Sequence, residues 1–308
     1  MNINDFWSLE TIQNYKTEEI FSKLSEFGIT LNEAEFLEQI QSCYRASELR
    51  KKWNTQYEIS AQGRDKDFLS LGARVLWERL APDCLNAEQL HDVIEAGLDD
   101  LEEEKEVQKT CDLWLEYWEK FKARFIPMGL SFAELDKKLD GGLYSVAGWL
   151  IEIADALNKF AQEDRSYFQK QIDYCEDVLT TFPDAEEDFV SDIISKKADC
   201  LFELEQVEAG DKCYDYILTH YPEGNAWMYM YWAGLYWEPN LCPPSRINFD
   251  KAEQIYRRGL ANSSPEFQSD ILRELKVLEK VRLKTKGFGG GEKQNVKKVK
   301  NVKKSKRK

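Results

Sequence analysis

The segment IISKKADCLFELEQVEAGDKCYDYILTHYP, residues 193–222, has the clearest helical pattern in the second half of this chain. Small and large apolar residues recur in it at helical spacing, with a polar turn in the middle and a proline at the end. The residues that carry this spacing are Ile194, Ala198, Leu201, Gly210, Tyr214 and Ile217. We therefore expect two antiparallel helices that are closed by Pro222.

Similar two-helix patterns lie on both sides of this segment. Small residues where helices cross, a large aromatic residue in the second helix and a closing proline are features of the tetratricopeptide repeat, which residues 143–265 resemble. The resemblance implies at least three helix pairs that stack into one superhelix with a concave groove. It also implies close helix crossings at Ala198, Gly210 and Gly234.

Helical periodicity continues through the rest of the chain, and no alternating strand pattern is evident. Capping residues stand three positions before Glu or Gln in five pairs, which is typical of helix starts: Asn32 with Glu35, Asn86 with Gln89, Ser131 with Glu134, Ser166 with Gln169, and Asp184 with Glu187. The sequence therefore predicts an all-α fold, with helices near residues 17–27, 32–44, 46–57, 66–80, 86–103, 105–125, 131–139, 143–162, 166–182, 187–204, 207–220, 226–237, 249–261 and 265–284.

Charge and composition divide the chain into three expected regions. Twelve Lys and Arg and one acid between Arg282 and Lys308 give this end a net charge of +11, whereas the whole chain carries −14. Three consecutive glycines and dense like charge predict that this end cannot bury enough apolar surface to fold. We expect a helical N-terminal domain at residues 1–141, tetratricopeptide-like helical repeats forming an α-solenoid at 142–285, and a disordered Lys-rich tail at 286–308.

The N-terminal half contains the stretch GRDKDFLSLGARVLWERLAPDCLNAEQLHDVIEAGLDDLEEE, residues 63–104. It resembles the N-terminal helical region of bacterial proteins that end in a SecA-C-terminal-like (SEC-C) zinc-binding motif. Those proteins finish in a cysteine-rich zinc knuckle, but no cysteine follows Cys242 in this chain. Zinc binding is therefore not carried over from the resemblance.

The stretch NAWMYMYWAGLYWE, residues 225–238, is unusually rich in aromatic side chains. Its apolar run of twelve residues is shorter than the roughly 20 that a membrane-spanning helix needs. One interpretation is a helix buried on two sides within the repeat stack. The other is that Met228, Tyr231 and Leu235 form an exposed apolar cluster in the groove, which would mark an interaction site.

The resemblance to the tetratricopeptide repeat also implies that several polar residues face the predicted groove. Tetratricopeptide domains that hold acidic C-terminal peptides use lysine and asparagine there, but this chain has mostly aspartate at those places. An acidic, partly aromatic groove favours a basic peptide by charge complementarity, although aspartates that merely solvate a surface are the alternative interpretation. The predicted partner-binding residues are Asp155, Asn158, Asp192, Asp199, Met228, Tyr231 and Leu235.

The sequence shows no pattern for catalysis, for a cofactor or for a metal. Seven cysteines are scattered singly without a C-x-x-C pair, and His91 and His220 have no nucleophile or acid at a motif spacing. We therefore expect no enzyme activity, no cofactor and no metal site. The N-terminus does not read as a signal peptide, so we expect a cytoplasmic protein without a membrane partner.

Two functions remain as hypotheses. The first is a non-enzymatic interaction scaffold that binds a protein or a basic peptide segment in the groove. The alternative is a nucleic-acid-associated protein that binds RNA or DNA through counterion release at its tail. The predicted polyanion-binding residues are Lys297, Lys298, Lys300, Lys303, Lys304, Lys306, Arg307 and Lys308.

Overall fold

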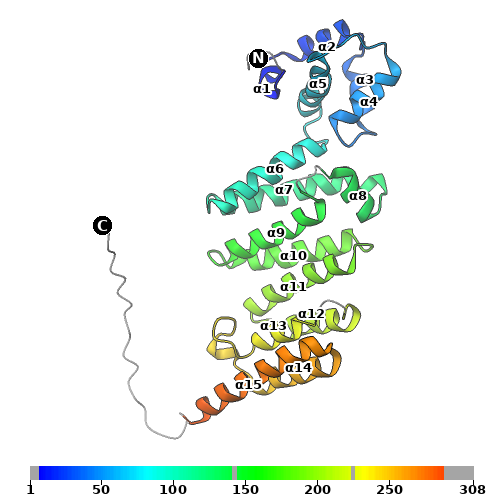
Figure 1. Ribbon diagram of the computed structural model, residues 1–308. Coiled ribbons are helices and arrows are strands. Elements are labelled where there is room, and N and C mark those ends of the chain that lie inside the picture. The colour runs from blue at the N-terminus through cyan, green and yellow to red at the C-terminus, as the bar shows by residue number, and fades with distance from the viewer. Residues whose placement is uncertain (1–6, 141–143, 223–225, 288–308) are drawn as a thin grey trace, which may run out of the picture. The chain divides into compact units, whose positions relative to one another are not determined.

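The computed structural model describes residues 7–140, 144–222 and 226–287, and these residues form helices and no β-strand (Figure 1). The predicted all-α class is therefore confirmed. The Lys-rich tail from residue 288 onward, with its eight predicted polyanion-binding residues, lies outside the described residues.

The chain divides into two compact units, residues 1–217 and 218–308. The division falls near the end of one helix, and the expected boundary at residues 141 and 142 lies inside the first unit. The helices of the first unit are α1 (Leu9–Gln13), α2 (Thr17–Glu26), α3 (Glu33–Ile40), α4 (Ala46–Gln56), α5 (Asp65–Leu80), α6 (Ala87–Glu102), α7 (Val107–Phe125), α8 (Phe132–Leu139), α9 (Val146–Ala161), α10 (Ser166–Thr181), α11 (Glu187–Glu203) and α12 (Val207–His220).

The first unit contains two separate clusters of buried apolar residues, which we call the first core and the second core. The first core runs from Ile12 to Trp77 and gathers α1, α2, α3 and α4 around α5. The second core runs from Leu85 to Leu201 and lies among α6 to α11. Within it the ring of Phe121 packs against the rings of Trp118 and Trp149, with centroids 5.6 and 5.8 Å apart.

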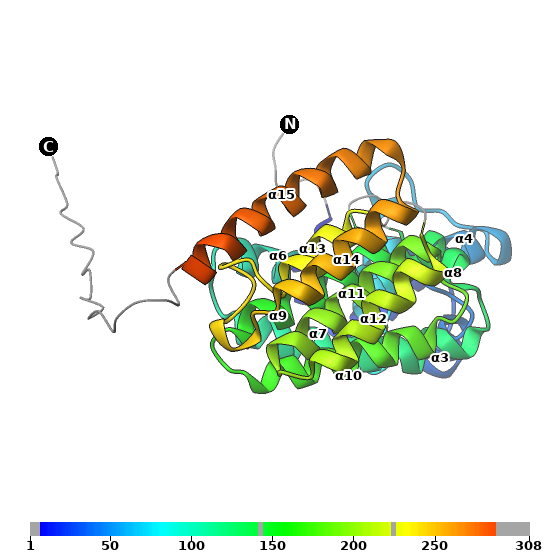
Figure 2. The same cartoon turned by 90° about the horizontal axis from the view of Figure 1, so that it is seen from below.

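The helices α9, α10 and α11 form regular layers within the second core. The middle helix α10 packs against both α9 and α11, and α9 also contacts α11 directly. Their long axes run side by side, as Figures 1 and 2 show from two directions. The hydroxyl of Tyr174 on α10 donates a hydrogen bond to the backbone oxygen of Leu150 on α9, at 2.8 Å, and fixes one of these contacts.

The predicted close crossing at Gly210 is confirmed. A Cβ atom at this position would lie 2.6 Å from two ring carbons of Phe202 and 3.3 Å from the backbone oxygen of Ala198. Only a residue without a side chain therefore fits between α12 and α11 at this point. At Gly234 the atoms nearest to an added Cβ belong to Glu238 and Leu241 of the following loop, at 2.9 to 3.2 Å, so the closest approach at this glycine is to that loop.

Three of the five predicted capping pairs are confirmed as capping boxes, at Asn32, Asn86 and Ser131. The other two pairs do not form capping boxes, although α10 and α11 begin at Ser166 and Glu187 as predicted. Ser166 is already the first residue of α10. Asp184 instead accepts a hydrogen bond from the backbone nitrogen of Phe132, 52 residues away, at 3.0 Å. The side chain of Asp184 therefore binds a distant backbone group and not the start of α11, where its spacing from Glu187 suggested a cap.

Polar side chains join the first core to the second core. The guanidinium of Arg124 on α7 donates from Nη2 to the backbone oxygens of Ile40, Gln41 and Cys43, at 2.8, 3.3 and 2.9 Å. These carbonyls lie at the end of α3 and just after it, and the oxygen of Ile40 also accepts from the backbone nitrogen of Cys43, at 3.1 Å. Glu88 of α6 accepts from the backbone nitrogen of Ala46, at 3.0 and 3.2 Å to its two oxygens. We call this set of contacts the junction.

The described part of the second unit contains the α-helices α13 (Met228–Gly234), α14 (Phe249–Asn262) and α15 (Pro265–Gly287), with a short 3-10 helix at Pro244–Arg246. The helix α14 packs against both α13 and α15. Gly259 allows this, since a Cβ there would lie 2.9 Å from Ile271 and from Tyr229. The aromatic stretch forms a shorter helix than the predicted 226–237, and most of its large side chains are buried.

Candidate peptide-binding surface

Four carboxylates gather where α9 and α11 lie against each other. Glu152 and Asp155 extend from α9, and Asp188 and Asp192 extend from α11. All four residues are exposed. Residues three and four apart share one face of a helix, which explains why each helix contributes a pair. We call these four residues the acidic surface.

The carboxylates of the acidic surface lie close enough to affect one another's pKa values. Partial burial raises the pKa of Asp192, and the neighbouring charges of Asp188 and Asp155 raise it further. Partial burial also raises the pKa of Glu152, again with a contribution from Asp155. Both effects mean that the negative charge of these groups is less favourable here than in water.

One lysine counteracts this repulsion. Lys196 on α11 forms an ion pair with Asp155 on α9, and its charge lowers the pKa of both Asp192 and Glu152. Its side chain is 20% exposed, whereas that of Asp155 is 52% exposed. Lys196 is the only cation of the described residues that acts on these carboxylates, and the acidic surface keeps a net negative charge.

Two of the predicted groove residues, Asp155 and Asp192, belong to the acidic surface. The other two predicted groove residues on these helices, Asp199 and Asn158, contact side chains inside the first unit. Asp199 is half-buried and accepts a hydrogen bond from the hydroxyl of Tyr214 on α12, at 2.5 Å. Asn158 is half-buried, with its amide nitrogen 4.0 Å from the sulfur of Cys200. These two side chains stabilise contacts within the first unit.

The three apolar groove residues belong to the second unit. Met228 is fully buried and Leu235 is 4% exposed, so neither presents an exposed apolar surface. Tyr231 is half-buried, with its ring centroid 6.3 Å from that of Trp227. The helix α13 is apolar nearly all round, so its periodicity alone could not tell a buried side from an exposed one.

Sequence reasoning did not select Glu152, Asp188 or Lys196, although the signal was available. Each acid lies three or four positions from a predicted aspartate, which is the spacing of neighbours on a helix face. Lys196 follows Asp192 by four positions and so joins the same face. A search for charge pairs at helical spacing would have found all three.

Metal-binding chemistry has no support in residues 7–140, 144–222 and 226–287, where no group of three or more His, Cys, Asp or Glu side chains could hold an ion. Burial raises the pKa of the Cys111 and Cys175 thiols to about 12, and these cysteines are consequently protonated near neutral pH. Such thiols pack as small apolar groups.

Among the described helices, none combines the length and the apolar character that a membrane crossing requires. No protein-family model matches the sequence. Comparison with curated proteins and with solved structures likewise finds no significant match.

Proposed function

We propose that this protein is a non-enzymatic interaction scaffold that binds a lysine- and arginine-rich peptide segment on the acidic surface. One observation carries the proposal: four exposed carboxylates lie on two adjoining helices, and among the described residues Lys196 is the only cation that pairs with Asp155 or lowers the pKa of Asp192 and Glu152. A peptide with several cations would supply the positive charge that the surface lacks. Electrostatic complementarity of this kind speeds association and selects between partners.

The raised pKa values of Asp192 and Glu152 support a cationic partner. A bound ammonium or guanidinium group would favour the charged form of each carboxylate and lower both pKa values. Exposed charges are screened over about 8 Å at physiological salt, so a peptide must lie directly on the surface to benefit. We therefore expect binding to weaken as salt is added.

The arrangement of α9 to α12 is consistent with the tetratricopeptide resemblance, which we retain as part of the proposal. In such repeats the first helices of successive units adjoin, and the second helices lie behind them. The contacts of α9 with α11, and of α10 with both, follow this order. On this interpretation the acidic surface lies on the concave side of the repeats. The resemblance of residues 63–104 to SEC-C proteins remains a prediction.

The test measures binding of a fluorescent basic peptide to the full chain by anisotropy. The peptide VKKVKNVKKSKRK, residues 296–308 of this chain, is a suitable cationic probe. We expect the double variant Glu152→Gln/Asp192→Asn to weaken binding about tenfold, equivalent to about 1.4 kcal/mol.

The matched control is Asp67→Asn/Glu95→Gln, which removes the same charge at exposed positions of α5 and α6. We expect it to change binding by less than about twofold, because surface charges far apart are screened. Equal losses in the two variants would mean that only the overall charge of the chain attracts the peptide. That result would refute the acidic surface as the site.

A second candidate function is nucleic-acid binding by the Lys-rich tail, favoured by its net charge of +11 from Arg282 to Lys308. Binding by charge alone depends steeply on salt, because each phosphate contact releases counterions. If roughly six lysines engage single-stranded RNA, the log–log salt slope should be about −4 to −5. RNA binding that persists after the eight predicted tail residues are changed to glutamine would refute this candidate.

A further inference from the structure

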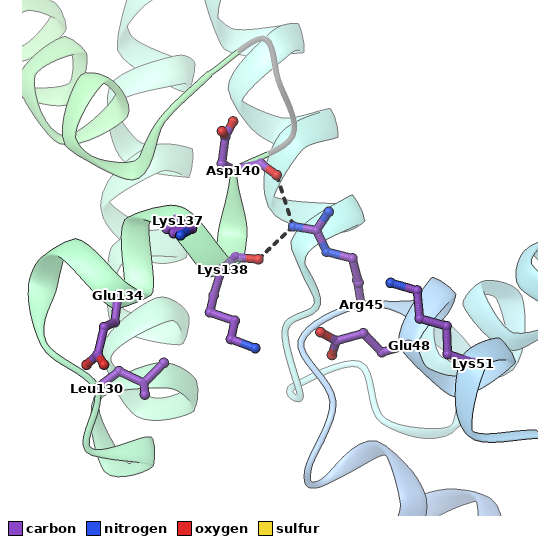
Figure 3. A pocket seen from close by; sticks show the side chains of 8 residues that line it. All are labelled: Arg45, Glu48, Lys51, Leu130, Glu134, Lys137, Lys138 and Asp140. Carbon is purple, nitrogen blue, oxygen red and sulfur yellow. Dashed lines mark hydrogen bonds between the residues drawn. The ribbon is translucent and has the colours of Figure 1, made fainter. Parts of the chain in front are cut away.

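The space between the start of α4 and the end of α8 forms an open pocket in the first unit, with a volume of about 450 Å³. Figure 3 shows that side chains from the two helices enter it from opposite sides. Four of the lining residues are cations and three are carboxylates. The cations are Arg45, Lys51, Lys137 and Lys138, and the carboxylates are Glu48, Glu134 and Asp140.

Arg45 holds the two sides of the pocket together. Its Nη2 atom donates to the backbone oxygens of Lys138 and Asp140, at 2.7 and 3.1 Å (Figure 3). An arginine side chain has five N–H groups, so those on Nε and Nη1 are not needed for this contact. The guanidinium is thereby fixed at the edge of the pocket while part of its donor capacity remains for a ligand.

The three lysines have no carboxylate partner. Lys51, Lys137 and Lys138 are exposed, and none forms an ion pair with any residue of the described chain. The ammonium of Lys138 lies 5.5 Å from the ring centroid of Tyr44, which favours a cation without neutralising it. The positive charge of these side chains is therefore available.

The carboxylates, in contrast, have local roles. Glu48 accepts from the backbone nitrogen of Tyr44 at 2.7 Å. Glu134 accepts from the backbone nitrogen and the hydroxyl of Ser131, at 3.0 and 2.8 Å, as part of the α8 capping box. The carboxylate of Asp140 points away from Arg45 in Figure 3. The acids reduce the positive charge of the pocket but do not pair with its lysines.

We propose that this pocket binds a small phosphate-bearing ligand, with a diphosphate as its anionic part. Lysines act as mobile point charges for phosphate, and arginine offers a planar fork of donors. Cations that approach from α4 and from α8 suit an anion with two charged ends, since each phosphate group can contact one side. The ligand would then bridge the two helices beside the contact that Arg45 already makes.

This inference does not depend on the proposed peptide binding, because the two sites involve different residues and opposite charge. A cationic peptide needs the acidic surface on α9 and α11, whereas a phosphate needs the lysines of α4 and α8. A variant that loses peptide binding should therefore still bind phosphate, and the reverse should also hold.

The experiment titrates the full chain with sodium pyrophosphate, and separately with inorganic phosphate, by isothermal calorimetry. We expect saturable 1:1 binding of pyrophosphate that is tighter than that of phosphate. The variant Lys51→Gln/Lys138→Gln should weaken it by at least about tenfold, because it removes one charge-assisted contact from each side. Both side chains are exposed and unpaired, so the fold should tolerate the change.

The matched control is Lys66→Gln/Lys212→Gln, which removes two exposed lysines from α5 and α12. We expect its affinity for pyrophosphate to stay within about twofold of the original, because the loss of distant charges is screened. Undiminished binding in Lys51→Gln/Lys138→Gln would place the anion elsewhere, for instance on the Lys-rich tail, and would overturn the proposal. Tighter binding of a short oligoglutamate than of pyrophosphate would overturn the assignment to phosphate.

Discussion

The layers formed by α9 to α12 and the junction between the two cores are both contacts between helices, but different side chains stabilise them. In the layers, apolar residues and the small Gly210 let neighbouring helices approach closely. At the junction, Arg124 and Glu88 bind backbone groups of a segment 42 to 84 residues away in the sequence. The difference teaches that a repeating apolar pattern can build layers, while joining two cores requires specific polar contacts between distant segments.

The largest effect should come from the junction, in the variant Arg124→Ala. It leaves the backbone oxygens at the end of α3 without their shared donor and removes a cation that lies 6.0 Å from the Trp77 ring. We expect a loss of about 3 kcal/mol in the free energy of unfolding, measured by urea denaturation. Arg257→Ala is the control, because this arginine is exposed and, among the described residues, pairs only with Glu253 one turn away. Its cost should be below about 0.5 kcal/mol.

A smaller effect is expected in the layers from Gly210→Ala. The added Cβ would meet the buried ring of Phe202, and the resulting overpacking should destabilise the protein by about 1–2 kcal/mol despite the better helix propensity of alanine. The control is Gly148→Ala in α9, where the new Cβ approaches only the Ser145 hydroxyl, at 3.1 Å. Thermal unfolding of the two variants should separate them clearly. An unchanged melting temperature for Gly210→Ala would contradict the tight crossing.

A polar contact within the layers should contribute less to the free energy of unfolding than the contacts at the junction do. Tyr174→Phe removes one hydrogen bond to Leu150, whose backbone oxygen lies in the middle of α9 and keeps its place in the helix. We expect a loss of about 1 kcal/mol by urea denaturation. Tyr117→Phe, at a half-buried position of α7, is the matched control. A loss as large as that of Arg124→Ala would remove the contrast between the two regions.

The smallest effect is a pH dependence at the junction. Burial raises the pKa of Glu88 in the folded protein, so the folded state binds its proton more tightly than the unfolded state does. Its contribution to stability should therefore be most favourable below the ordinary pKa of glutamate and should fall as pH rises through the raised value. We expect the unfolding free energy of the original protein to fall relative to that of Glu88→Gln as pH rises from 4 to 7. A difference that is constant across this range would show that Glu88 is not the group responsible.

The features predicted well from sequence were those with local signals. The helix predicted at residues 207–220 is found at Val207–His220, and three capping boxes were correct. Each depends on residues within about one turn of each other, so the pattern is visible along the chain. The tight crossing at Gly210 was also predicted, because a small residue stands in a regular apolar face.

The junction could not be predicted in this way. Arg124 lies 81 to 84 residues from the carbonyls that it binds, and Glu88 lies 42 residues from Ala46. No periodicity links such positions, since their meeting depends on how complete helices are arranged. Two of the four acidic-surface residues, Asp155 and Asp192, were predicted from sequence. The other two were missed because the comparison with the repeat pattern considered single positions and not the charge of a whole helix face.

The separation of the first core from the second core has a consequence for how the first unit opens. The two clusters share no buried apolar residue, and they are connected through the junction and through the stacked rings of Tyr44 and Phe125. Proteins open in contiguous units of different free energy, and here the junction is the natural boundary between two of them. Amide hydrogens of α5 and of α10 should accordingly exchange with solvent at two distinct rates, and breaking the Arg124 contacts should widen the gap between those rates.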